Sequence, residues 1–163
     1  PLQLDFELNN TCNLRCVGCT WSKEPADTAV NFPIEKFKEI ISEGAKNGLA
    51  ALDMSFVNEP LIRSDLPAFI RFAKTNGILD ISFNTNAVLL SKKMSDELLE
   101  SGLTRIQFSI DALTEDFYNR VRPGGDFRKV FDNVKYFIEQ ARKTKGLLTA
   151  VRTLERLAEA SAA

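Results

Sequence analysis

The sequence predicts an α/β protein with a parallel β-sheet built from βαβ repeats. Short apolar segments of strand length alternate with longer amphipathic segments, and proline or glycine marks most of the boundaries between them. The order strand, helix, strand, helix favours right-handed crossovers and therefore a parallel sheet. In such sheets functional side chains gather at the C-terminal ends of the strands, so we expect the functional site there.

Four apolar segments are expected to be the strands of this sheet. Each is rich in Leu, Ile or Phe and has a polar residue near its C-terminal end. The four segments are residues 2–8, 50–57, 78–83 and 104–110.

Five amphipathic segments between and after these strands are predicted to be helices. Their apolar residues recur at helical spacing, and glycine follows several of them. The expected N-terminal residues are Pro33 in a first turn and Asp65, Ser91 or Ser95, Thr114 and Asp126 as caps. The expected helices cover about 33–47, 65–76, 91–101, 114–121 and 126–141.

The C-terminal segment, residues 147–163, is predicted to be one amphipathic helix with an alanine-rich tail. Its Leu and Val residues recur at helical spacing, although a fifth strand over 147–153 is a less favoured alternative. We therefore expect a single domain in which residues 1–146 form a core of four to five strands and residues 147–163 form the helical tail.

Composition and charge exclude several classes of function. The chain has 163 residues and a net charge of -1, so no electrostatic field indicates a nucleic acid or a membrane as its partner. No apolar run is long enough to cross a bilayer, and no signal peptide is visible. There is no histidine, which removes the commonest general base and histidine-ligated zinc. The chain begins at Pro1 rather than Met, which indicates processing or excision from a longer protein.

The three cysteines, Cys12, Cys16 and Cys19, lie within eight positions directly after the first expected strand. An odd number argues against a disulfide framework, and closely spaced thiols need a reducing compartment, so we expect the protein to be cytoplasmic. Three thiolates at this spacing can hold a [4Fe–4S] cluster and leave one iron open to an outside ligand. Zinc is a weaker alternative because it needs a fourth ligand from a carboxylate or a second chain.

The Cys-x3-Cys-x2-Cys motif, placed after a first strand and before βα repeats, resembles the radical S-adenosylmethionine (SAM) superfamily. The resemblance runs from about residue 2 to about residue 146 and is strongest to members with an additional C-terminal cluster domain, of the SPASM or twitch type. The stretches 108–112, 120–122 and 127–134 carry that closer similarity. The resemblance implies a partial TIM-like (βα) barrel.

The resemblance also implies an activity. Members hold a [4Fe–4S] cluster that binds and reductively cleaves SAM, and the resulting 5′-deoxyadenosyl radical abstracts hydrogen from a peptide, sugar or other small substrate. An external electron donor of the flavodoxin or ferredoxin type is implied as well. Because the cofactor carries the difficult chemistry and the protein positions it, we assign no catalytic residue.

The segment 57–60 ends the second expected strand, where the family often has Gly-Gly-Glu-Pro. Through this match, Asn58, Glu59 and Pro60 are implied to meet the SAM ammonium group with backbone and carboxylate oxygens. Asn58 and the preceding Val57 replace both glycines of the family pattern. The alternative is a surface turn with a solvated glutamate.

Further SAM-binding residues are implied at the ends of the next two strands. Asn84 ends the third strand, and Ser109 and Asp111 end the fourth, with alternatives as turn or capping residues. Arg122 could pair with the SAM carboxylate or be a solvated surface residue.

One position before the third cysteine also departs from the family pattern. Gly18 stands where many members have an aromatic residue that packs near the adenine. The nearby Trp21 either supplies that aromatic surface or covers the loop.

The chain also lacks parts of the family's core, which has six βα units, and no cysteine follows Cys19. We expect either a natural or engineered fragment of a longer enzyme or a homodimer that completes the open barrel. Three hypotheses therefore remain: an enzyme, a module that binds the cluster and SAM without turnover, and a folded scaffold without a cluster.

Overall fold

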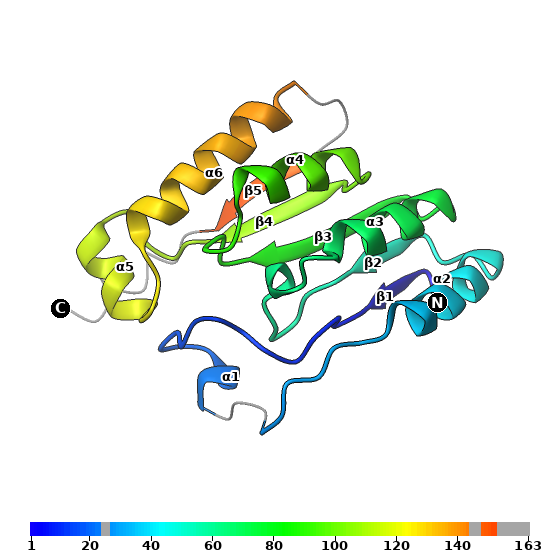
Figure 1. The fold of residues 1–163 in the computed structure, drawn as a ribbon, viewed down its shortest axis with the longest axis horizontal. Helices are drawn as coiled ribbons and strands as arrows, with labels where there is room; N and C mark the ends of the chain where they lie inside the picture. Colours follow the sequence, from blue (N-terminus) through cyan, green and yellow to red (C-terminus); the bar gives the residue numbers. More distant parts are fainter. Residues whose placement is uncertain (24–26, 144–147, 153–163) are drawn as a thin grey trace.

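The computed structural model describes residues 1–23, 27–143 and 148–152, the last segment by its backbone, and shows one five-stranded parallel sheet. The strands lie in chain order, each hydrogen-bonded to the next (Figure 1). The strands are β1 (Gln3–Asp5), β2 (Ala51–Asp53), β3 (Asp80–Thr85), β4 (Arg105–Ser109) and β5 (Leu148–Arg152). The four strands expected from apolar segments are confirmed, as is the parallel α/β class.

Helices connect the strands, and the four long ones pack side by side in one layer (Figure 1). Pairwise contacts join α2 to α3, α3 to α4 and α4 to α6. The helices are α1 (Thr20–Lys23), α2 (Ile34–Lys46), the 3-10 helix η1 (Pro60–Ile62), α3 (Leu66–Thr75), α4 (Lys92–Glu100), α5 (Glu115–Val121) and α6 (Phe127–Ala141). All five predicted helices are confirmed, whereas the short α1 and η1 were not predicted.

Side-chain caps explain where three of these helices begin. Ser91, Thr114 and Asp126 each accept a hydrogen bond from the backbone N–H three residues later, which satisfies one of the free donors in a first helical turn. The alternative cap Ser95 instead lies inside α4. Asp65 precedes α3 but makes no side-chain cap, because its carboxylate pairs with Arg63.

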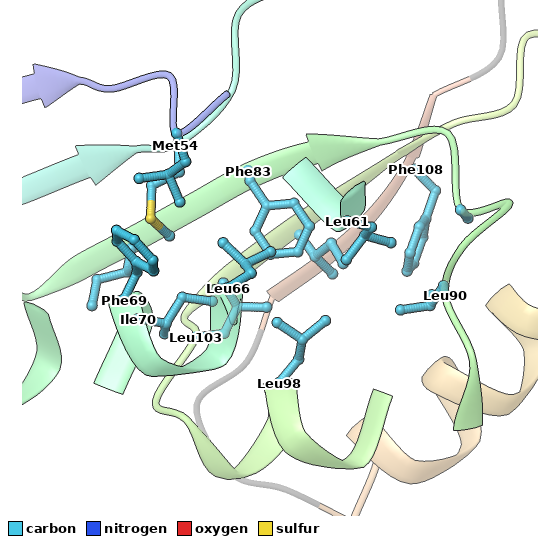
Figure 2. Packing of buried hydrophobic residues seen from close by; sticks show 14 of the residues in the cluster. Met54, Leu61, Leu66, Phe69, Ile70, Phe83, Leu90, Leu98, Leu103 and Phe108 are labelled. Atoms are coloured by element: carbon cyan, nitrogen blue, oxygen red, sulfur yellow. The ribbon is translucent and has the colours of Figure 1, made fainter. Parts of the chain in front are cut away.

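The hydrophobic core lies between the sheet and the helical layer (Figure 2). Phe83 of β3 and Phe108 of β4 contribute from the sheet, and Phe69 and Leu98 contribute from α3 and α4. Alternate residues of a strand point to opposite faces, so the intervening positions face away from these helices. That other face is polar: the Oγ atom of Ser82 donates to Asp53 at 3.1 Å.

The C-terminal segment differs from the prediction. Residues 148–152 form β5, which pairs in parallel with β4, so a helix beginning at residue 147 is wrong over this stretch. Apolar spacing alone fits either structure, but a strand here supplies backbone partners that an uncovered β4 edge would lack. The predicted division after residue 146 therefore separates a strand from the sheet to which it belongs. The predicted tail over 153–163 lies outside the described residues.

The parallel arrangement brings the C-terminal ends of all five strands to one edge of the sheet. In Figure 1 the arrowheads point towards the left, where α1 and α5 lie. Within the described part of the chain, no helix is both long and apolar enough to cross a membrane.

Candidate functional site

A cavity of about 560 Å³ lies at this edge of the sheet. Its volume is in the range typical of sites for small organic ligands. It is lined by Cys12 and residues 16–20 from the loop after β1, residues 55–59 after β2, residues 84–86 after β3, and Ser109, Asp111, Phe117, Val121 and Arg122 after β4. The loops that follow four different strands therefore build one site.

The cysteine loop is held against the end of α5. The backbone N–H of Val17 donates to the carbonyl of Val121 at 3.0 Å, and that of Cys19 donates to Cys16 at 3.1 Å. The Leu14 side chain, 1% exposed, anchors the middle of the loop. These contacts place all three cysteines on the wall of the cavity.

Two of the cysteine sulfurs receive hydrogen bonds from side chains outside the loop. Asn86 Nδ2 lies 3.8 Å from Cys12 Sγ, and Arg122 Nη1 lies 3.5 Å from Cys16 Sγ. Burial raises the pKa of both thiols, and the Arg122 charge opposes this rise in the pKa of Cys16. The guanidinium is thus placed to favour the thiolate form, which is the form that binds metal.

The three thiols on the cavity wall come from one loop. No group of three or more Cys, Asp or Glu side chains in the described part of the chain is arranged to hold a single metal ion. A zinc site would require its sulfurs within about 2.3 Å of one point, whereas a cube of four irons assigns each thiolate to a different iron. Three thiolates match the three protein-held irons of a cluster with one open iron, whereas zinc would need a fourth ligand.

Arg122 is fixed by a second partner, Asp111. Nη2 of Arg122 donates to Oδ2 of Asp111, and both side chains lie on the cavity. Asp111 adopts a left-handed backbone conformation with φ of 60°, which aspartate tolerates better than most residues. Asp111 follows the end of β4, and in this conformation its carboxylate pairs with Arg122.

The Glu59 side chain is only 2% exposed, and both of its carboxylate oxygens accept hydrogen bonds. Its carboxylate accepts from the Thr85 hydroxyl at 2.7 Å, and from the backbone amides of Asn86 at 2.8 Å and Leu61 at 3.0 Å. Burial raises the pKa of this carboxyl group, and the same three hydrogen bonds oppose that rise. The alternative of a solvated surface glutamate is therefore wrong.

Two buried donors on the cavity wall have no partner in the described part of the chain. They are Nδ2 of Asn58 and Nε of Arg122. The Asn58 amide is oriented because its Oδ1 atom accepts from the N–H of Phe56 at 3.2 Å. Unpaired buried donors are costly, so an acceptor oxygen that reached either of these two atoms would stabilise the wall.

The structure brings nearly all the predicted site residues together. Asn58, Glu59, Asn84, Ser109 and Gly18 line the cavity with the cysteines, Asp111 and Arg122.

The predicted SAM-binding residue Pro60 and the aromatic residue Trp21 do not line the cavity. Pro60 is buried at the start of η1 and does not line it. Trp21 covers the cysteine loop instead of facing the cavity: it is buried, its Nε1 donates to Asn10 O at 2.9 Å, and Arg15 stacks on its ring.

Several wall residues were missed by sequence reasoning. Phe56, 82% exposed, and Ser55 follow β2, where the strand-end rule could have found them. Phe117 and Val121 reach the cavity from α5, and their four-residue spacing places them on one helix face. No local signal distinguishes that face from one that packs against the core.

Comparisons with known proteins identify the family of this chain. The model of the radical SAM superfamily matches residues 6–160. The GTP 3',8-cyclase of Clostridium botulinum (strain Hall) is 33% identical over 137 residues, which are 81% of this chain and 42% of that enzyme. A probable GTP 3',8-cyclase of Methanococcus maripaludis is 31% identical over 136 residues, covering 82% of this chain and 45% of that protein.

A solved structure supports the fold. SuiB of Streptococcus suis bound to SAM aligns with a TM-score of 0.77 over 94% of this chain and 34% of that chain, at 19% identity. The present chain thus spans less than half the length of each of these proteins. Enzymes of the superfamily bind a [4Fe–4S] cluster and SAM. Because the superfamily model matches most of this chain, the chain belongs to the radical SAM superfamily.

Proposed function

We propose that the chain is the cofactor-binding portion of a radical SAM enzyme. Cys12, Cys16 and Cys19 would hold a [4Fe–4S] cluster through three of its irons. Once bound, the cluster would supply the electron that splits SAM into methionine and a 5′-deoxyadenosyl radical. The observation that carries this proposal is the convergence of the three cysteines and two unpaired donors on one cavity.

Asn58 and Arg122 would bind the amino-acid end of SAM. Asn58 Nδ2 and Arg122 Nε are donors suited to its carboxylate. Ser109 and Gly18 would lie beside the ribose and adenine of SAM. The wall is open at Gly18, where an added Cβ atom would meet no atom within 4 Å. Phe56 and Phe117 would exclude water from the apolar part of this wall.

The substrate is a small molecule or a peptide in this proposal. The relatives named GTP 3',8-cyclase make GTP the first substrate to test. A polar substrate agrees with the sheet face opposite the helices, where Asp53, Ser82 and Arg105 are joined by hydrogen bonds.

A second candidate function is a module that binds the cluster and SAM but does not turn over by itself. The five-stranded sheet leaves β1 paired on one side only in the described chain, and the chain covers 42% of a relative. Residues that complete the substrate wall would then come from other segments or from a second copy.

An anaerobic assay tests both candidates. The chain is reconstituted with iron and sulfide, given SAM and a strong reductant, and assayed for 5′-deoxyadenosine with and without GTP. A control variant in which all three cysteines are replaced by alanine should take up no cluster. Nucleoside formation by the wild-type chain supports the enzyme, cluster absorbance without nucleoside supports the module, and absence of iron uptake contradicts both.

A further inference from the structure

Three donors of the protein bind the buried carboxylate of Glu59. Oε1 accepts from Thr85 Oγ1 and Leu61 N, and Oε2 accepts from Asn86 N, all at 2.7–3.0 Å. Thr85 is the last residue of β3 and Asn86 begins the turn after it, whereas Leu61 lies in η1 after β2. The carboxylate therefore ties together the loops that follow two neighbouring strands.

The backbone of Glu59 joins a third loop to these two. Its N–H donates to the carbonyl of Thr11 at 2.8 Å, and its carbonyl accepts from Asn9 Nδ2 at 3.2 Å. The Oδ1 atom of Asn9 in turn accepts from the Thr11 backbone at 2.9 Å. Thr11 immediately precedes Cys12, so the start of the cysteine loop is fixed to Glu59.

Asn86 extends the connection to the cysteine itself. Its Nδ2 donates to Asn13 Oδ1 at 2.9 Å and lies 3.8 Å from Cys12 Sγ. The turn that carries it is tight: Ala87 has a left-handed φ of 60°, and its N–H donates to Thr85 Oγ1 at 3.0 Å. A non-glycine residue in this conformation needs surrounding contacts to hold it, and the Glu59 carboxylate supplies two of them.

We infer that Glu59 is a positioning residue for the cluster loop, acting through Asn86 on Cys12 and Asn13, rather than a direct ligand of the SAM ammonium group. The cluster part of this inference rests on the proposed function. The resemblance to the family implies a direct contact with SAM, but here the side chain is buried and satisfied by the protein. Residues that hold metal ligands in place commonly affect metal affinity by about 10- to 100-fold when replaced.

The variant Glu59→Gln separates these roles with little change in volume. A glutamine oxygen can keep the Thr85 and Leu61 bonds of Oε1, but its NH2 group then faces the Asn86 N–H, donor against donor. The alternative amide orientation keeps the Asn86 bond and places NH2 against the Leu61 N–H. Either way, glutamine cannot reproduce the full set of contacts.

The first measurement uses the chain without a cluster. Amide hydrogen exchange should be slow at Asn86 in the wild type and clearly faster in Glu59→Gln, with faster exchange also in the peptide that contains Cys12 and Asn13. The control Glu39→Gln removes an exposed carboxylate paired with Lys36 on α2 and should leave these rates unchanged. Unchanged exchange at Asn86 and in the cysteine-loop peptide of Glu59→Gln would overturn the inference, whether or not the chain binds a cluster.

The second measurement uses the reconstituted chain. Glu59→Gln and Asn86→Ala should each lose iron to a chelator about 10- to 100-fold faster than the wild type, and the double variant should be little worse than the more affected single variant. Normal iron retention with weakened SAM binding in Glu59→Gln would instead show a direct SAM contact and overturn the inference. A wild-type chain that takes up no iron contradicts the proposed function, and the exchange measurement then decides the role of Glu59 in the loop.

Discussion

The guanidinium of Arg122 joins Asp111 to Cys16: Nη2 donates to the Asp111 carboxylate, and Nη1 lies 3.5 Å from the Cys16 sulfur. Asp111 lies in the loop after β4, Arg122 follows α5, and Cys16 lies in the cysteine loop. One cation thus offsets a carboxylate and a potential thiolate on the same wall, while its Nε remains unpaired in the described chain. This arrangement leaves a buried donor for an additional acceptor.

Replacing Arg122 should weaken SAM binding. Loss of a charge-assisted hydrogen bond costs about 1.5–3 kcal/mol, which corresponds to roughly a 10- to 100-fold higher Kd in Arg122→Ala. Arg122→Lys should restore only part of the affinity because a single ammonium group cannot keep the branched contacts. Equilibrium binding of SAM to the reconstituted chain measures this. The matched control Arg128→Ala removes an exposed arginine and should leave the Kd unchanged; an unchanged Kd in Arg122→Ala would contradict the prediction.

Gly18 on the cavity wall and Gly125 in the turn after α5 should respond differently to replacement by alanine. A Cβ at Gly18 would meet no atom within 4 Å, whereas one at Gly125 would lie 2.6 Å from the Tyr118 hydroxyl. Gly18→Ala should therefore change the free energy of unfolding by less than about 0.5 kcal/mol, and Gly125→Ala should lower it by about 1–3 kcal/mol. Urea unfolding of the cluster-free chain measures both. Equal stability of the two variants would contradict the geometry of the 122–125 turn.

Arg63 should contribute strongly to stability away from the cavity. Its Nη1 donates to the carbonyls of Leu8 at 3.0 Å and Phe32 at 2.9 Å, and the side chain is 10% exposed. Arg63→Leu leaves the Phe32 carbonyl without this donor, whereas the Leu8 carbonyl keeps its bond from the Phe32 N–H at 2.8 Å. The change should therefore cost about 1–3 kcal/mol. Thermal unfolding checks this, with Arg71→Leu on the exposed side of α3 as the control. A loss no larger than that of the control would contradict this contribution of Arg63.

Tyr118 should make stability depend on pH in the alkaline range. Burial raises its pKa to about 12, from about 10 in an unfolded chain. The unfolded chain therefore releases this proton first, so the stability is complete below pH 10 and declines as the pH rises from 10 to 12. Urea unfolding of the cluster-free chain at pH 8, 10 and 11 should show this decline.

The Tyr118→Phe variant provides the matched comparison. The Tyr118 hydroxyl is buried and has no partner in the described chain, so its removal at pH 7 should cost less than about 1 kcal/mol or stabilise the protein. Above pH 10 the variant should also lose stability less steeply than the wild type. Part of the decline should remain because the exposed Tyr136, whose pKa is raised by Asp96, is still present. An equally steep decline would mean that Tyr118 does not cause it.

Much of the fold and of the site could be predicted because the relevant signals are local. Alternating apolar segments indicated the first four strands, and Thr114 and Asp126 cap helices through contacts only three residues away. The cysteine spacing placed three thiols in one loop, and the strand-end rule brought Asn58, Glu59 and Ser109 to one edge of the sheet. For β5 the local signal was ambiguous, and pairing with β4 determined the structure.

The sequence by itself determined the order of strands and helices, the cysteine motif and the edge of the sheet at which the site forms, because periodicity, capping and parallel topology depend on neighbouring residues and on chain order. Only the tertiary structure decided what each polar side chain does there. Glu59 is buried among donors 26 and 27 positions away, and Arg122 reaches a cysteine 106 positions away. Such partners follow from packing between loops of different strands, and no local pattern encodes them.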